Sequence, residues 1–114
     1  MKLPFCVFLG LASPLFAVPV YIGTNTGGNT NSKGIYQADF DPETGKLGET
    51  KLAAEYRNPG FLIQHPTKPV LYACGQPNKP FDDGSDSVAA FTIGADHSLK
   101  FLGESTSGGR GVCH

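Results

Sequence analysis

Three short segments of this sequence recur about 50 residues further along the chain. The segment VYIG at Val20 is matched by LYAC at Leu71, an offset of 51 positions. GIYQADFD at Gly34 is matched by SVAAFTIG at Ser87 with an offset of 53, and GKLGET is matched by HSLKFLGE with an offset of 52. Repeats of this length are typical of arrays in which one unit cannot bury its apolar faces alone. The chain is therefore expected to build one stacked unit after another.

Each unit consists of short apolar runs separated by Gly, Pro, Asn and Asp. The run Ile35 to Phe40 alternates with a period of two, which indicates β structure. With only 17% charged residues, surface helices stabilised by ion pairs are disfavoured. Four short strands in about 50 residues make one blade of a β-propeller. Expected strands cover residues 18–23, 35–40, 46–55, 61–65, 70–74, 87–93 and 99–104, of which 46–55 gives the weakest signal.

The phase of the repeat predicts which strands are present. Residues 18–114 hold under two four-stranded blades, so the expected fold class is an all-β, partial β-propeller. The first blade has three strands and lacks its innermost one, which the C-terminus of a longer chain would supply. The second blade has four, and Gly111 to His114 begin the innermost strand of a third. Such a piece would be incomplete and inactive by itself.

The first seventeen residues resemble a secretory signal peptide. Lys2 provides a positive charge, Leu3 to Phe16 are uncharged, and Ala17 is a small residue at which cleavage would leave Val18 first. The stretch is shorter than the ~20 residues that span a membrane. The alternative is a buried N-terminal strand or helix. We predict a signal peptide over residues 1–17 and export to the periplasm or the extracellular space.

Export would place Cys74 and Cys113 in an oxidising compartment, where disulfides persist. The two are 39 positions apart, and spacing alone does not show whether their side chains meet. Each lies in an apolar strand context that suits a buried free thiol. We therefore expect two unpaired, buried thiols, with a disulfide as the alternative.

Composition and motifs disfavour several classes of ligand. A formal net charge of −1 gives no electrostatic footprint for nucleic acid or for an anionic membrane surface. No Cys or His spacing suits zinc, and the acidic DDGSD segment lacks the ligand spacing of an EF-hand, so we interpret it as a flexible loop. TNTGGNTNSKG has glycines but no helix after it to bind phosphate. We predict no metal and no cofactor, and the sequence does not set an oligomeric state.

Five segments occur in an order that resembles a known family. They are VYIGTNTGG, SKGIYQADFDPETGKL, RNPGFLIQHPTKPVLYACGQ, DSVAAFTI and SGGRGVCH. Together they are similar to the start of the lactonase family of seven-bladed β-propellers, typified by cycloisomerase-like 6-phosphogluconolactonases, over Val18 to His114. The resemblance implies hydrolysis of a small sugar lactone, without a cofactor, by the full-length protein. The same fold also carries a muconate lactonizing activity.

The resemblance also implies candidate site residues. The family motif Gly-Pro-Cys-His stands here as Gly-Val-Cys-His, which makes His114 the candidate base that activates water, with Arg110 as the group that stabilises the oxyanion. Arg57 and Asn58 lead into the inner strand of the second blade and are candidates for substrate binding. Gln76 stands where many members have Glu. This departure favours the alternative of a non-catalytic exported propeller that binds a carbohydrate or protein partner.

Overall fold

The computed structural model describes residues 16–114, and the predicted signal peptide lies almost entirely outside this range. Within the described residues the fold is all-β, as predicted, with eight strands and no helix. No helix in this part of the chain is long and apolar enough to cross a membrane. The strands are β1 (Val18–Gly23), β2 (Gly34–Asp41), β3 (Lys46–Leu47), β4 (Lys51–Glu55), β5 (Arg57–Gln64), β6 (Val70–Gln76), β7 (Ser87–Ile93) and β8 (Leu99–Thr106).

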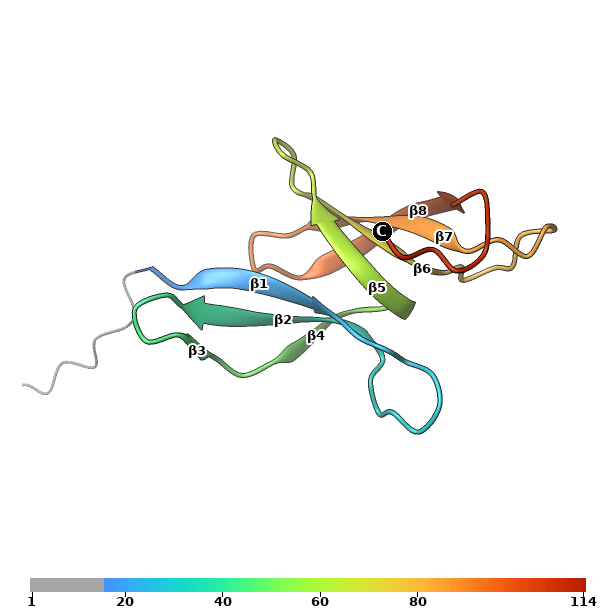
Figure 1. Cartoon of the computed structure of the whole chain (residues 1–114). Helices are drawn as coiled ribbons and strands as arrows, with labels where there is room; N and C mark the ends of the chain where they lie inside the picture. The colour runs from blue at the N-terminus through green and yellow to red at the C-terminus, as the bar shows by residue number, and fades with distance from the viewer. Residues whose placement is uncertain (1–15) are drawn as a thin grey trace, which may run out of the picture.

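The strands form two antiparallel sheets, which correspond to the two predicted blades (Figure 1). Blade one has β2 at its centre, with β1 on one side and both β3 and β4 on the other. It therefore has three strand positions, and β1 pairs with no second strand among the described residues. Blade two is a regular meander in the order β5-β6-β7-β8. The predicted run at 46–55 is divided because Gly48 leaves the ladder and donates its N–H to the carbonyl of Asp39 at 2.8 Å.

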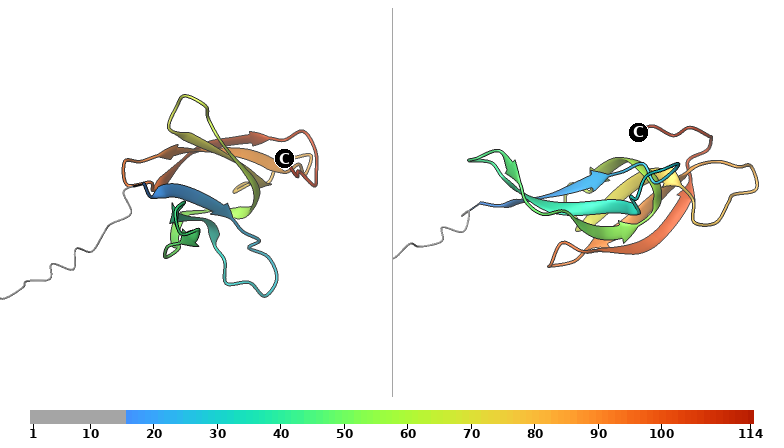
Figure 2. Two further views of the ribbon diagram at one scale, coloured as in Figure 1. Left: turned by 60° about the vertical axis from the view of Figure 1, so that its left-hand side comes forward. Right: turned by 90° about the horizontal axis from the view of Figure 1, so that it is seen from below.

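Chain reversals separate into two kinds, which lie at opposite ends of the sheets (Figures 1 and 2). The turns at one end are short. The first of them has Gly45 at a φ of 72°, as its DPETGK sequence predicts, and its N–H bonds to the Asp41 carbonyl at 2.8 Å. In the next, His65 Nδ1 accepts two backbone N–H bonds at 3.1 Å. The opposite end carries the long loops 24–33 and 77–86 and the segment 107–114.

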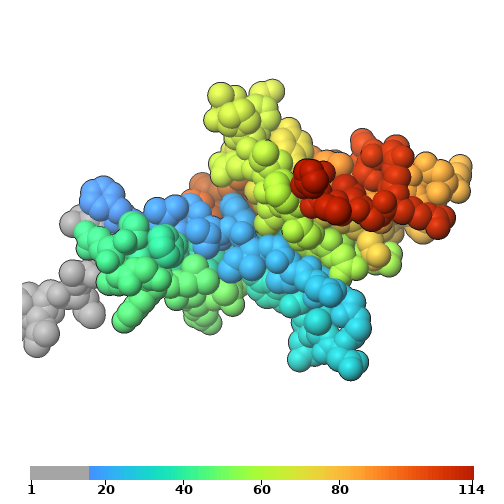
Figure 3. All heavy atoms as spheres, in the orientation of Figure 1, coloured from blue at the N-terminus to red at the C-terminus, as the bar shows by residue number. Residues whose placement is uncertain are grey.

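The core lies between the facing surfaces of the two blades, which pack against each other (Figure 3). It consists of fully or almost fully buried residues from both sheets and their connection: Ile35, Tyr56, Leu71, Ala73, Ala89 and Phe91. Alternation along β6 explains this selection, because Leu71, Ala73 and Gly75 face blade one while Tyr72 and Cys74 face away. One face of each blade is thus buried by its neighbour.

Tyr56 connects the two blades at the point where the chain crosses from β4 to β5. Its hydroxyl donates to the carboxylate of Glu104 at 2.9 Å, and its oxygen lies 2.5 Å from Ser87 Oγ. Ser87 Oγ in turn donates to the carbonyl of Gly75 at 3.0 Å. Burial raises the pKa of Tyr56 well above its ordinary value, so this phenol stays neutral. The ring stands edge-on to Phe91 at a centroid distance of 5.6 Å.

The other face of blade two, its outer face, points away from blade one and is apolar and open. Phe61, Ile63 and Leu102 are 44, 59 and 56% exposed, and Tyr72 and Val88 lie on the same face. A propeller buries such a face beneath the next blade. Within residues 16–114 the segment after β8 reaches it through His114.

The segment after β8 differs from prediction. Gly111 to His114 were expected to begin a strand, but residues 107–114 have no ladder hydrogen bonds and form an irregular segment. A strand requires a neighbour to satisfy its N–H and C=O groups. The neighbour expected here is the following strand of the repeat, which the 114 residues do not include. That this segment begins a third blade stays a prediction.

Because the outer face of blade two and one edge of β1 are open, we predict that the 114-residue chain self-associates. Replacing both Ile63 and Leu102 with Lys should reduce the associated fraction, because charges oppose burial of this face between two copies. Light scattering after size-exclusion chromatography measures the effect. The matched control is the N31K/T67K pair, which adds the same charge at exposed loop positions. An equal associated fraction in the two variants would contradict the assignment of this face as the associating surface.

Candidate functional site

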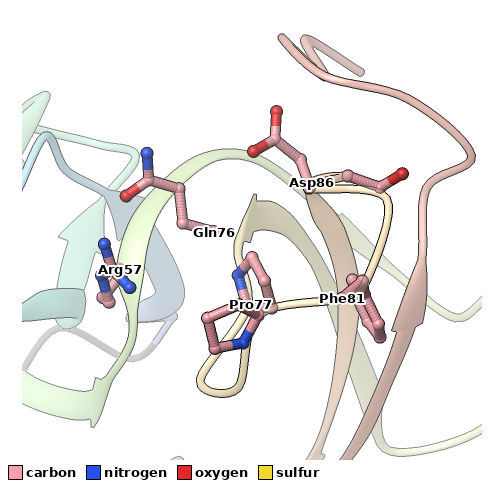
Figure 4. Close-up of a pocket in the computed structure, with 8 residues that line it drawn as sticks. Arg57, Gln76, Pro77, Phe81 and Asp86 are labelled. Carbon is pink, nitrogen blue, oxygen red and sulfur yellow. The ribbon is translucent and has the colours of Figure 1, made fainter.

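The longer loops place several polar side chains at one end of blade two. Arg57 and Gln76 are partners in the β5–β6 ladder. Together with the 77–86 loop they line an open pocket of about 190 Å³ (Figure 4). Its other lining residues are Pro77, Pro80, Phe81, Gly84, Ser85 and Asp86. Ligand pockets usually measure roughly 300–1,000 Å³, so this one has room for only part of a ligand, such as a phosphate or a hydroxyl-bearing carbon.

Arg57 and Gln76 give this pocket its hydrogen-bonding character. Arg57 is exposed, and in Figure 4 it lies on the same side as Gln76, with Phe81 and Asp86 opposite. A guanidinium binds phosphate or carboxylate through two parallel N–H bonds. The neighbouring Gly75 permits this arrangement, because a Cβ there would lie 2.7 Å from the carbonyl oxygen of Arg57. The close approach of β6 to the start of β5 therefore requires glycine.

Asn58 is placed as a connection between the blades. Its Oδ1 accepts bonds from the N–H and the hydroxyl of Thr26, at 2.8 and 3.2 Å, and its own N–H donates to Thr26 Oγ1 at 3.0 Å. Its Nδ2 donates to Gln76 Oε1 at 3.0 Å. The backbone has a φ of 47°, a conformation that Asn tolerates better than most residues. Asn58 thus ties the loop after β1 to β6 and leaves little of its side chain free for a substrate.

Arg110 lies against the rim of the 77–86 loop. Its guanidinium is next to Gly84, where an added Cβ would clash with it. The pKa of Asp83 is lowered, first by hydrogen bonds from Ser85 and also by the positive charge of Arg110. Arg110 is exposed and points a cation toward this end of the blade.

Asp86 anchors the segment that carries Arg110 and His114. Its carboxylate accepts the N–H groups of Gly111 and Val112, at 2.5 and 3.1 Å. Its backbone N–H and C=O bond to Gly109 and Ser107 at 2.8 and 2.9 Å. The prediction of a flexible acidic loop is therefore wrong for Asp86. These bonds join two segments about 25 residues apart, so no local pattern in the sequence indicates them.

His114, in the irregular segment after β8, packs against Phe61 of β5, the innermost strand of blade two. Its ring is 6.1 Å from that of Phe61, in an edge-on arrangement, and the side chain is exposed. Within residues 16–114 the imidazole has no hydrogen-bonding partner that would orient it as a base. Of the predicted site residues, Arg57 lines the pocket, Asn58 supports Gln76 beside it, and Arg110 borders Gly84. His114 stands apart from the pocket.

The structure describes two cysteines, Cys74 in β6 and Cys113 in the segment after β8. Two buried thiols were predicted. Cys74 is only half-buried, and the prediction is wrong for Cys113, whose side chain is exposed. Both are free thiols in the structure. Among the described residues, no group of three or more His, Cys, Asp or Glu side chains is arranged to hold a metal ion.

Comparison with known proteins gives the same architecture. Residues 19–114 match the family model described as "Lactonase, 7-bladed beta-propeller". The chain is 35% identical over 95 residues to a 6-phosphogluconolactonase of Bacillus subtilis, covering 82% of this chain and 25% of that protein.

Two crystal structures also superpose on the fold. They are proteins from Bacteroides fragilis and Bacteroides uniformis whose assignment as 6-phosphogluconolactonases is provisional. Both have a TM-score of 0.70, with 30 and 26% identity, and the match covers 85% of this chain and 26% of each of theirs. The chain thus spans about a quarter of the length of these relatives. It belongs to the lactonase family of seven-bladed β-propellers.

Proposed function

We propose that a complete protein containing this segment hydrolyses a sugar lactone, in the manner of a 6-phosphogluconolactonase. Family membership and the likeness to the Bacillus subtilis protein support the reaction class. The structural observation that carries the proposal is the gathering of Arg57, Gln76 and Arg110 at the loop end of blade two, while His114 packs against Phe61 further along β5. These groups offer hydrogen-bond donors, positive charge and one imidazole.

In this reaction a water attacks the lactone carbonyl, and the ring C–O bond of the tetrahedral intermediate then breaks. A base must take the proton of the water, and a cation or hydrogen-bond donor must stabilise the oxyanion. His114 suits the first role because an imidazole titrates near neutral pH. Arg110 suits the second, and Arg57 suits a substrate phosphate or carboxyl group. The groups that orient His114 would come from other blades.

The predicted export bears on the substrate. An exported enzyme would not meet intracellular sugar phosphates, which favours an unphosphorylated lactone or another ligand. The small pocket at Arg57 would then receive a hydroxyl or carboxyl group instead of a phosphate. Comparing the turnover of glucono-lactone and of its 6-phosphate ester by the complete protein distinguishes an unphosphorylated from a phosphorylated substrate.

A second candidate is a non-catalytic propeller that binds a carbohydrate or protein partner. Gln76 favours it, because an amide in this pocket cannot exchange a proton as a carboxyl group would. Glu at this position would still accept the bond from Asn58 Nδ2. A protein that binds lactone without hydrolysing it, and that gains turnover on Gln76→Glu, would support this second function.

The role of His114 can be tested in a hybrid of the Bacillus subtilis enzyme in which residues 19–114 of this chain replace the matching segment. We expect the hybrid to hydrolyse the lactone and His114→Gln to lower kcat by about a hundredfold or more, because the base is lost. The matched control is His97→Asn, since Asn also tolerates the φ of 64° at that turn. Unchanged kcat in His114→Gln would contradict the assignment of the base.

Arg57 is expected to act in binding. Replacing it with Gln in the hybrid should raise KM for a phosphorylated or carboxylated substrate by about tenfold or more with a smaller change in kcat, because a charge-assisted hydrogen bond is worth roughly 1.5–3 kcal/mol. Lys68→Gln removes an equal charge from the short turn at the other end of the blade and serves as control. A fall in kcat at constant KM would instead place Arg57 in the chemical step.

Asn58 is expected to position the pocket without binding substrate. Asn58→Gly keeps the backbone conformation and loses the side-chain bonds, so unfolding of the hybrid in urea should show a loss of about 1–2 kcal/mol. Asn58→Ala should cost roughly 1–2 kcal/mol more, because Ala resists a positive φ. If Asn58→Gly raised KM strongly without changing stability, Asn58 would be a binding residue as the sequence first suggested.

A further inference from the structure

Cys74 and Cys113 lie on one face of blade two. Cys74 is the ladder partner of Phe61 in β5 and of Val88 in β7, so the three side chains share the face that points away from blade one. The ring of His114 packs on Phe61. Cys113, next to His114 in the chain, is thereby brought over the part of the face that Cys74 occupies.

Contacts on both sides of Cys113 hold its backbone near this face. Asp86 binds the N–H groups of Gly111 and Val112 immediately before Cys113, and the ring contact of His114 holds the chain immediately after it. The Cys113 thiol donates only to the nearby carbonyl of Gly111, at 3.4 Å. The pKa of Cys74 supports the proximity of the two sulfurs, because it is raised first by burial and then by the charge of a Cys113 thiolate.

We propose that Cys74 and Cys113 form a disulfide under oxidising conditions, which fastens the segment after β8 to the outer face of blade two. The two thiols have different exposures, and this sets the order of events. Cys113 is exposed and meets the oxidant, whereas Cys74 is half-buried beside it and completes the bond.

A small-molecule disulfide such as glutathione disulfide serves as the two-electron oxidant. The Cys113 thiolate attacks one sulfur of glutathione disulfide, and one glutathione thiolate leaves. The Cys74 thiolate then attacks the Cys113 sulfur of the mixed disulfide and expels the second glutathione. Two protein thiols are oxidised, one glutathione disulfide is reduced to two thiols, and these take up the two protons that the cysteines release.

The test uses the whole 114-residue chain with Cys6→Ser, so that only Cys74 and Cys113 can pair. The protein is equilibrated at high dilution in a glutathione redox buffer, quenched with acid, digested without reduction and analysed by mass spectrometry. We expect a Cys74–Cys113 cross-linked peptide within one chain. Its equilibrium yield relative to the mixed disulfides should be at least about tenfold higher in buffer than in urea, where the thiols meet only through loop closure.

A second pair of variants tests whether the fold brings the thiols together. Asp86→Ala removes the anchor of Gly111 and Val112 and should lower the cross-linked yield toward the value in urea. Asp82→Ala, an exposed position in the same loop, should leave the yield unchanged. Separate glutathione adducts on both cysteines, disulfides between chains, or equal pairing in buffer and in urea would each overturn the proposal.

Discussion

The face-to-face packing of the two blades is the interaction on which the rest of the structure depends. Neither sheet could bury its apolar residues alone, and Ile35 of one blade and Leu71 and Phe91 of the other form a single cluster. Tyr56 lies in this cluster and also satisfies its hydroxyl through Ser87 and Glu104. Both Ser87 and Glu104 belong to blade two. Tyr56 therefore joins the connection between the sheets to blade two by polar contacts as well as by the packing of its ring.

This packing also determines where the long loops and the pocket at Arg57 lie. In a meander, successive reversals alternate between the two ends of the sheet, and in this sequence the long loops alternate with the short turns, so that the long loops share one end. Asn58 joins the loop after β1 to blade two, because it binds Thr26 on one side and Gln76 on the other. The pocket at Arg57 therefore depends on contact between the blades, although blade two alone lines it.

Local patterns were sufficient to predict most of the fold. Alternation and turn chemistry fixed the strands because each signal lies within a few residues, as in Asp41 to Gly45. The start of β5 was predicted too late because Arg57 joins the ladder across a bulge, and no periodicity marks a bulge. In the site, Arg57 could be chosen from its position in the repeat and Arg110 from the family resemblance, and the roles of both stay predictions. The anchoring role of Asp86 and the structural role of Asn58 could not, since both depend on partners distant in sequence.

The anchor at Asp86 links the proposed base to the proposed disulfide. Hydrogen bonds to one carboxylate hold Gly111 and Val112, and the next two residues are Cys113 and His114. Val112 stands where the family motif has Pro, so the backbone there is not preset by a ring, and the carboxylate has to fix it instead. A bond from Cys113 to Cys74 would add a second fixed point one residue before the imidazole. A base acts well only when its position is held, so oxidation of this pair would favour catalysis by His114 by restricting where its ring can lie.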